Sequence, residues 1–316
     1  MGTPNRESRL NLYYSFYVMR WKFAANVAKM AALALLLFAA APLAKEWKVD
    51  PTWLHRYVPE VAEKTSDVTT DSCHSQPIFG EGDPEAGILR SVARFGEVTV
   101  DAGGECKVVR YERQEEIYFV LKGSGTLHYG PEQAPMRKND FTYLPPGVSH
   151  TLSNPAQEPL RVVVMGVKIP ADVAIQPAVP KPAIANLDQV KEQTVEGHPV
   201  SVQYKLLIGP RTGTRDLINA TYVVIDTFLM DFAPGGTNFP HHHLTAEEIY
   251  LVLDGEGSMV AGGGMDGTEG RHAARAGDAY YFRPNCTVGF YNSDRPGAKA
   301  HILALRSRVP LPKRAD

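Results

Sequence analysis

The chain of 316 residues has few cysteines and almost no net charge. Its 33 Lys+Arg against 35 Asp+Glu leave a net charge of −2, which argues against binding DNA or RNA by neutralising phosphates, so no nucleic-acid partner is expected. Its three cysteines form no Cys-x-x-Cys pair, so no structural zinc site is expected. No amphipathic stretch of about 12 residues with helical periodicity occurs, which argues against a helical bundle or a coiled coil.

Cys73, Cys106 and Cys286 allow at most one intrachain disulfide. If a pair forms, we expect Cys73 to bond to Cys106, because both lie in the first half of the chain. The alternative is three unpaired and mostly buried thiols, and the sequence leaves both hypotheses open.

One long apolar run lies near the N-terminus, at residues 31–44, and Arg20, Lys22 and Lys29 precede it. A basic flank, an apolar core and small residues at its end predict an export signal, and translation from Met19 gives it a normal length.

We assign residues 1–44 to a cleaved signal peptide or an uncleaved membrane anchor. As an anchor, residues 23–44 are long enough to cross a bilayer and are the only membrane contact we expect. With a cleaved signal, the protein is expected to be exported to the periplasm or the extracellular space. With an uncleaved anchor, it is expected to be held at the membrane. In both cases the folded part is expected to lie in an oxidising compartment.

The remainder of the chain contains an internal repeat. The segment starting at Glu115, EEIYFVLKGSG, is nearly identical to the segment starting at Glu247, EEIYLVLDGEG. A second match, ending at Asn154 and Asn292, follows after extra residues in the glycine-rich segment 262–270. Two homologous domains are the simplest explanation.

Short apolar runs separated by Gly, Pro, Asn and Asp predict an all-β protein built from antiparallel sandwiches or barrels. Two of these runs, 117–121 and 249–253, show no polar alternation, so both faces of each strand are expected to be covered. Packing between subunits of a homodimer or packing of one domain on the other would each achieve this.

The second repeat contains His241, His243 and Glu248. Histidines two apart in an extended segment share one face, and the four intervening residues allow a turn that brings the carboxylate back beside them. Two imidazoles and one carboxylate predict a site for a divalent metal, with open positions for water, oxygen or a substrate.

This pattern resembles the first signature of the cupin superfamily, Gly235-x5-His241-x-His243-x4-Glu248-x6-Gly255. The second cupin signature is met in the first repeat by Pro145, Gly147, His150 and Asn154, with Asn139 in place of the opening glycine. The resemblance implies two tandem cupin-type jelly-roll β-barrels after the signal or anchor segment. The expected boundaries are an N-terminal extension at 45–77, cupin domains at 78–168 and 201–310, a linker at 169–200 and a tail at 311–316.

The sequence departs from the family pattern in both repeats. Val288 stands where the resemblance places a fourth ligand, and Val109 and Tyr111 replace the two histidines of the first repeat. The first domain then keeps a degenerate site of Tyr111, Glu116 and His150, with too few ligands for a tight metal site. We therefore expect one divalent metal per chain, in the second domain, with Fe or Mn favoured and Zn or Ni as alternatives.

Four further residues are weaker candidates for this site. His301, which alternates with leucines on the last strand, is a candidate fourth ligand if it points inward. Tyr281 and Tyr291 are candidates for hydrogen bonds to a bound water or substrate. His242 is expected to point to the other face, as a bystander or as a group behind the ligands. The alternatives are a satisfied histidine in the core or at the surface, and tyrosines that only pack.

The predicted function is dioxygenase-like oxidation of a small organic substrate at the metal. No catalytic residue is assigned, since further carboxylates that could act as a general base, such as Glu247 and Asp278, are expected to be solvated turn residues. The alternatives are a metal-dependent isomerase or aminohydrolase, which the resemblance also allows, and a binding protein that captures a sugar or sugar acid without turnover. A structural role, as in storage bicupins, is less consistent with three correctly spaced ligands.

Overall fold

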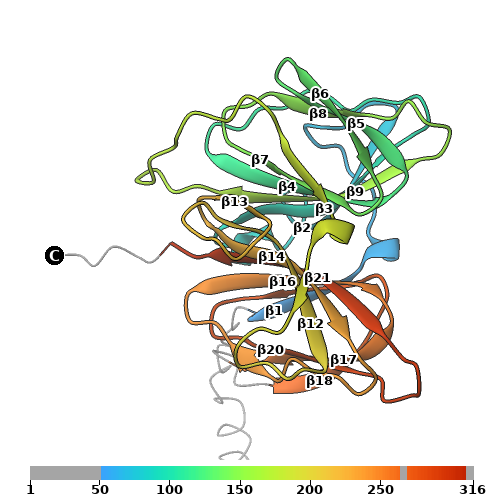
Figure 1. The fold of residues 1–316 in the computed structure, drawn as a ribbon, viewed down its shortest axis with the longest axis vertical. Helices are drawn as coiled ribbons and strands as arrows, with labels where there is room; N and C mark the ends of the chain where they lie inside the picture. Colours follow the sequence, from blue (N-terminus) through green and yellow to red (C-terminus); the bar gives the residue numbers. More distant parts are fainter. Residues whose placement is uncertain (1–50, 264–268, 311–316) are drawn as a thin grey trace, which may run out of the picture. The chain divides into compact units, whose positions relative to one another are not determined.

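The computed structural model describes residues 51–263 and 269–310, which are almost entirely β-strand, and so confirms the predicted all-β class (Figure 1). The predicted signal or anchor segment, 1–44, and the predicted tail, 311–316, lie outside the described residues. Three short 3-10 turns occur in the described part: η1 (Val58–Glu60), η2 (Ala86–Ile88) and η3 (Leu187–Gln189). Across the two described ranges, no helix is long and apolar enough to cross a membrane.

The first domain is a jelly-roll barrel of two sheets. The larger sheet contains, in order, β10 (Ala183–Asn186), β7 (Asp140–Leu144), β4 (Gln114–Lys122), β9 (Leu160–Lys168), β3 (Val92–Val100) and β2 (Cys73–Gly80). The smaller contains β6 (Glu132–Arg137), β5 (Ser124–Tyr129) and β8 (His150–Ser153). Side chains from both sheets, among them Val98, Tyr118 and Leu127, form its interior.

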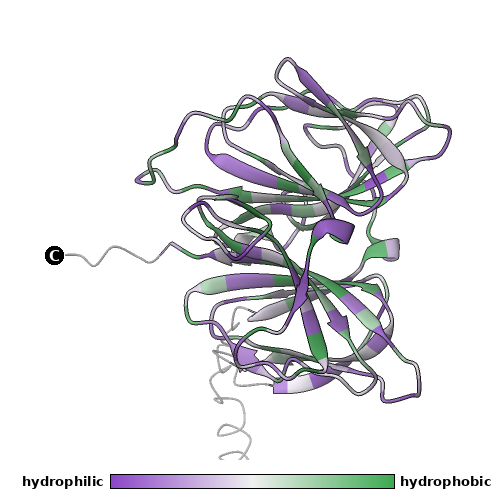
Figure 2. Cartoon of the chain, viewed as in Figure 1, coloured by the Kyte–Doolittle hydropathy of each residue, from purple (hydrophilic) through white to green (hydrophobic). Residues whose placement is uncertain are grey.

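The second domain repeats this arrangement. Its larger sheet contains β1 (Trp53–Tyr57), β19 (Asp278–Phe282), β16 (Ala246–Asp254), β21 (Ala300–Arg308), β14 (Val224–Phe232), β12 (Val202–Pro210) and β11 (Glu192–Gln193), with β13 (Ile218–Thr221) beside β12. Its smaller sheet contains β15 (His241–His242), β20 (Thr287–Asn292), β17 (Glu256–Gly262) and β18 (Glu269–Arg275). The repeated EEIY segments occupy the equivalent strands β4 and β16. Strands such as β12 and β21 carry both hydrophilic and hydrophobic residues (Figure 2).

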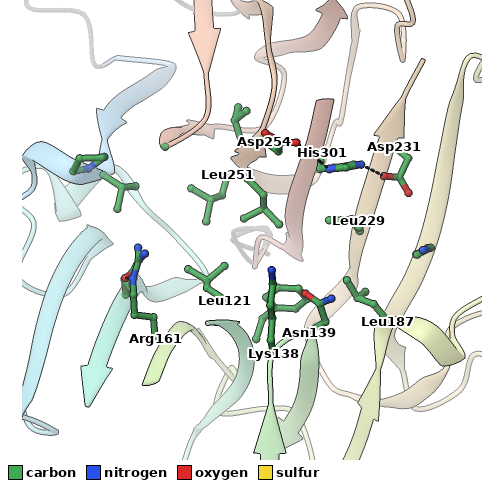
Figure 3. A pocket seen from close by; sticks show the side chains of 18 residues that line it. Leu121, Lys138, Asn139, Arg161, Leu187, Leu229, Asp231, Leu251, Asp254 and His301 are labelled. Atoms are coloured by element: carbon green, nitrogen blue, oxygen red, sulfur yellow. Dashed lines mark hydrogen bonds and ion pairs between the residues drawn. The ribbon is translucent and has the colours of Figure 1, made fainter. Parts of the chain in front are cut away.

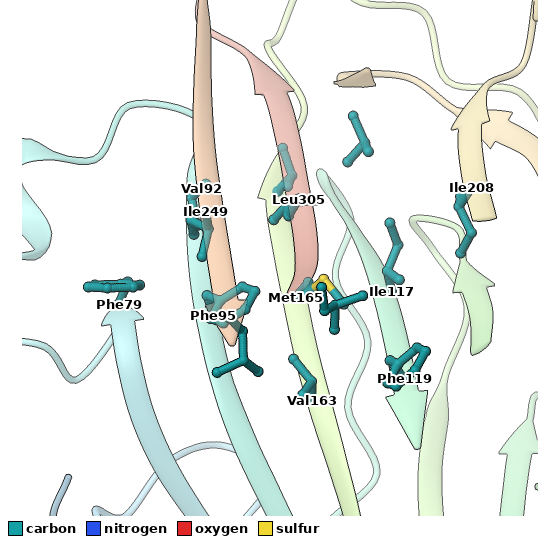
Figure 4. Close-up of a cluster of buried hydrophobic side chains, with 14 of the residues drawn as sticks. Phe79, Val92, Phe95, Ile117, Phe119, Val163, Met165, Ile208, Ile249 and Leu305 are labelled. Carbon is teal, nitrogen blue, oxygen red and sulfur yellow. The ribbon is translucent and has the colours of Figure 1, made fainter. Parts of the chain in front are cut away.

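The two larger sheets pack against each other through a shared apolar cluster (Figure 4). Strand β16 directs Ile249 and Leu251 into this cluster, whereas Tyr250 and Val252 fill its own barrel. Strand β4 divides its side chains in the same way. Both faces of these strands are therefore covered, as predicted, and the cover is the other domain of the same chain. These strands consequently give no argument for a homodimer.

The predicted extension and linker both contain strands that the barrels use. In the segment 45–77, β1 pairs with β19 of the second barrel, with Leu54 opposite Tyr281. In the segment 169–200, β10 pairs with β7 of the first barrel, with Ile184 opposite Thr142. Each barrel thus takes an edge strand from the segment that precedes the other barrel, which local sequence patterns do not reveal.

Glu247 is a further contact between the barrels. It is fully buried on β16, and its carboxylate accepts hydrogen bonds from the backbone at residues 90–92, including Ser91 N at 2.8 Å and Val92 N at 3.1 Å. Tyr281 Oη donates to the same carboxylate at 2.7 Å. The expectation of a solvated turn residue is wrong here, because the strand that carries Glu247 faces the other barrel. Asp278 is also buried, and its Oδ2 accepts a hydrogen bond from Arg275 N at 2.7 Å.

Glu115, the first-domain counterpart of Glu247, makes the reciprocal contact. Its carboxylate accepts hydrogen bonds from the backbone of residues 222–224 at 2.7 to 2.9 Å and from Tyr143 Oη at 3.0 Å. Burial raises the pKa of Glu115, although these donors partly oppose the rise. The first glutamate of each EEIY segment thus ties its strand to the other barrel.

Cys73 and Cys106 form a disulfide across 33 residues of chain, and Cys286 is buried. We expect the double variant Cys73→Ser/Cys106→Ser to lose about 3 kcal/mol of unfolding free energy, because the open chain gains loop entropy when it unfolds. Urea unfolding of the variant and the oxidised wild type measures this difference. An equal midpoint for both proteins would show that the bond contributes nothing to stability.

Candidate metal centre

The part of the first cupin signature that contains the candidate ligands forms a strand, a turn and a second strand. His241 lies on β15, which pairs with β20, and Glu248 lies on β16, which pairs with β19 and β21. The turn between the strands brings His243 to the same place. The ligand atoms of His241, His243 and Glu248 all lie within 4.8 Å of one another. The structure therefore brings together the three residues that the sequence proposes as ligands.

The chemistry of these residues fits a divalent metal. Glu248 is 2% exposed, and its buried Oε2 makes no hydrogen bond, although His243 Nε2 lies 3.1 Å away. A buried carboxylate in this state is costly unless a cation meets it. Nδ1 of His241 lies 2.8 Å from the carbonyl oxygen of Phe239, which only accepts, so Nδ1 carries the proton and Nε2 keeps its lone pair for a metal.

The protonation states also suit metal binding. Burial lowers the pKa of His241, which keeps its ring neutral to lower pH. Burial by itself raises the pKa of Glu248, but His243 and the charge of Arg306 outweigh burial, and the pKa falls below its usual value. Ligands must be deprotonated to bind a metal, so both shifts favour binding at neutral pH.

The three residues line a small cavity of about 30 Å³. The other lining residues are Val195, His198, Tyr204, Leu206, Arg215, Asp226, Phe228, Tyr250 and Arg306. Arg306 Nη1 lies 3.4 Å from His243 Nε2, and Asp226 accepts hydrogen bonds from Arg306 Nε at 3.0 Å and from Arg215 Nη2 at 2.7 Å. No spacing in the sequence connects these residues to the signature, so sequence reasoning missed them.

His301 does not join this group, which corrects its proposed role as a ligand. Its Nε2 lies 2.7 Å from Asp231 Oδ1, in a separate pocket between the barrels (Figure 3). Alternation along β21 explains the error: His301 shares a face with Leu303 and Leu305, which point into the interface between the barrels, whereas Arg306 lies on the other face. Val288, in the fourth-ligand position, is 1% exposed and packs in the core of the second barrel.

The remaining candidates also lie outside the cavity. Tyr281 points toward the interface between the barrels, where its hydroxyl donates to Glu247 on the neighbouring strand β16. The ring of Tyr291 packs under the guanidinium of Arg271, 3.9 Å from the ring centroid. His242 is exposed and is not among the residues that line the cavity. These three residues therefore do not contact the proposed metal position.

The degenerate site of the first barrel contains a cation of its own. Arg94 Nε donates to Glu116 Oε1 at 2.8 Å, and the same guanidinium bonds to Tyr111. His150 Nε2 lies 3.6 Å from Glu116 Oε2. Burial raises the pKa of Glu116, but Arg94 and His150 outweigh it and lower the pKa. A guanidinium thus neutralises the carboxylate that a metal would otherwise meet, which favours a metal-free first barrel.

Comparison with known proteins identifies the family. Residues 96–166 and 228–300 match the family model of the cupin domain. A putative glyoxylate-induced protein from Pseudomonas aeruginosa shares the fold with a TM-score of 0.65 at 16% identity, over 84% of this chain and 92% of that chain. A Bacillus subtilis oxalate decarboxylase mutant does so with a TM-score of 0.59 at 12% identity, over 83% and 78%.

Among curated relatives, oxalate oxidase GF-3.8 from Triticum aestivum is 35% identical over 100 residues, which cover 27% of this chain and 45% of that protein. The matches span from 14% to 59% of the lengths of the curated relatives. Both family matches coincide with the two barrels and with the internal repeat. The chain therefore contains two cupin domains in tandem, the arrangement of a bicupin.

Proposed function

We propose that this bicupin is an exported metalloenzyme that oxidises a small organic acid, in a dioxygenase-like reaction, at one divalent metal in its second barrel. The observation that carries this proposal is the convergence of His241, His243 and Glu248 within 4.8 Å, around a buried carboxylate oxygen that makes no hydrogen bond. Iron and manganese are favoured because they support oxygen chemistry with such ligands.

The charge of the cavity favours an anionic substrate. Its charged lining residues are two arginines, Arg215 and Arg306, and two carboxylates, Asp226 and Glu248, whose charges cancel. A divalent metal would leave a net charge of about +2 beside neutral histidines, which suits a small dianion. Two of the similar proteins, an oxalate oxidase and an oxalate decarboxylase, act on a dicarboxylate of this kind, which supports the proposal.

The small volume of the cavity favours a small substrate over a large one. A volume of about 30 Å³ is room for about two water molecules, at 10–15 Å³ for each. Such a space fits a compact chelator better than a sugar, so the cavity favours a small acid over a sugar or sugar acid.

The residues around the cavity would bind and orient this substrate. A bound metal would supply oxygen activation and would polarise the substrate carboxylate. Arg306, which Asp226 holds in place, presents Nη1 beside the metal ligands and can donate to a substrate carboxylate. Among the lining residues, Leu206, Phe228 and Tyr250 restrict water. Asp226 is paired with both arginines, so no carboxylate that lines the cavity is available as a general base.

Export is part of the proposal. The basic and apolar segment at the N-terminus supports it. The disulfide between Cys73 and Cys106 also supports an oxidising compartment, because such bonds are rare in the cytosol.

Elemental analysis and oxygen uptake test the proposed function. We expect about one manganese or iron per chain, and oxygen consumption when a small dicarboxylate such as oxalate is added. His241→Ala is expected to abolish both, and His242→Ala, its exposed neighbour, is expected to keep both. Protein that contains only zinc and consumes no oxygen with any small organic acid would contradict the proposal.

The same assay separates the alternatives. Product formation without oxygen consumption would indicate an isomerase or an aminohydrolase. Binding without turnover would indicate a ligand-binding bicupin, an alternative favoured by Val288 in the fourth-ligand position and by the Arg94–Glu116 pair in the first barrel.

A further inference from the structure

One more histidine lines the metal cavity, and it comes from outside both cupin signatures. His198 lies in the turn between β11 and β12, in the segment that links the two domains. Its half-buried side chain lines the same cavity as His241, His243 and Glu248. In sequence it is 43 residues from His241, so no local spacing connects the two.

The rings of His198 and His243 lie at similar distances from the ring of His241 and at similar angles to it. The ring centroids of His198 and His241 are 5.2 Å apart, and their planes meet at 88°. The corresponding values for His241 and His243 are 4.9 Å and 79°. His241 therefore has two imidazole rings beside it at similar distances and angles, and the cupin signature accounts for only one of them.

The hydrogen bonding of His198 also matches that of a ligand. Its Nδ1 lies 3.3 Å from the carbonyl oxygen of Glu196, two residues earlier in the chain. His241 makes the same contact with the carbonyl oxygen two residues before it, that of Phe239. A carbonyl only accepts, so Nδ1 carries the proton in both rings and Nε2 keeps its lone pair. Metal-binding histidines are oriented in this way.

We propose that His198 is the fourth protein ligand of the second barrel and substitutes for the histidine that Val288 replaces. This inference rests on the proposed metal site. His198 is not among the three residues whose ligand atoms lie within 4.8 Å of one another, so its side chain must move inward to complete the coordination. Metal binding would then fix the turn between β11 and β12 beside the cavity.

Titration of the metal-depleted full-length protein with Co(II) tests this role without any activity assay. We expect wild type and His198→Ala each to bind one Co(II), with an affinity about 10- to 100-fold lower in the variant. X-ray absorption is expected to count three imidazoles in wild type and two in the variant, and the visible spectrum of Co(II) is expected to change with the ligand number. His242→Ala, an exposed histidine beside the site, is the matched control and should behave as wild type.

The outcomes distinguish this proposal from the one on which it rests. If His198→Ala keeps the wild-type affinity, spectrum and imidazole count while His241→Ala loses the metal, His198 is not a ligand and the metal site stands. If wild type binds no Co(II), the proposal of a metal site and the proposal of a fourth ligand are both wrong. A lower affinity with one imidazole fewer establishes His198 as a ligand.

Discussion

Replacing Glu247 with alanine is expected to lower the free energy of unfolding by about 4 kcal/mol, because several buried hydrogen-bond donors lose their shared acceptor. The variant leaves the buried backbone donors of residues 90–92 and the hydroxyl of Tyr281 without their acceptor. Each hydrogen bond to a charged group is worth about 1.5–3 kcal/mol, and an unpaired buried donor costs about 1–3 kcal/mol. Chemical unfolding followed by tryptophan fluorescence measures the loss.

Two further variants make this prediction specific. Glu247→Gln keeps the shape but replaces one acceptor oxygen with a donor, so an intermediate loss is expected. Glu192→Ala removes an exposed carboxylate that lies 3.3 Å from Lys205 Nζ, and its effect should stay below about 1 kcal/mol. If Glu247→Ala unfolds at the same denaturant concentration as Glu192→Ala, the buried carboxylate does not hold the barrels together.

The second large effect is expected for Glu248→Gln, which should weaken metal binding at least about 100-fold. The amide keeps the packing of a side chain that is 2% exposed but removes the anionic oxygen beside His243. A hundredfold change in affinity corresponds to about 2.7 kcal/mol. Metal content by elemental analysis, and the rise in melting temperature when metal is added, both report this loss, because a ligand that binds only the folded state stabilises it.

Glu116→Gln is the matched control in the first barrel. Its carboxylate is equally buried, but Arg94 already neutralises it, so this variant should keep the wild-type metal content even where it is less stable. If Glu116→Gln loses the metal and Glu248→Gln retains it, the metal binds in the first barrel and not in the second.

Much of the architecture follows from local patterns in the chain. The near-identical EEIY segments predict a duplicated domain, and the structure places them on the equivalent strands β4 and β16. The uninterrupted apolar runs in these segments predict strands covered on both faces. They do not tell which surface provides the cover, because a homodimer and two domains of one chain bury the same side chains.

The cluster of candidate metal ligands is predictable for the same reason. His241, His243 and Glu248 lie within eight consecutive residues, and strand alternation with one tight turn is enough to bring them together. The errors concern residues whose orientation depends on strands distant in sequence. His301 and Tyr281 lie on strands with two buried faces, and hydrophobic alternation alone does not tell the barrel interior from the interface between the barrels.

The sequence by itself determined the all-β class, the duplication and the three clustered ligands, because each depends on residues close together in the chain. Only the tertiary structure decided that β1 and β10 each join the other barrel, and that the two barrels cover each other. It also placed His198 and Arg306 beside the metal ligands. These contacts join segments far apart in sequence, and their register is set by the packing of whole sheets, which no local spacing encodes.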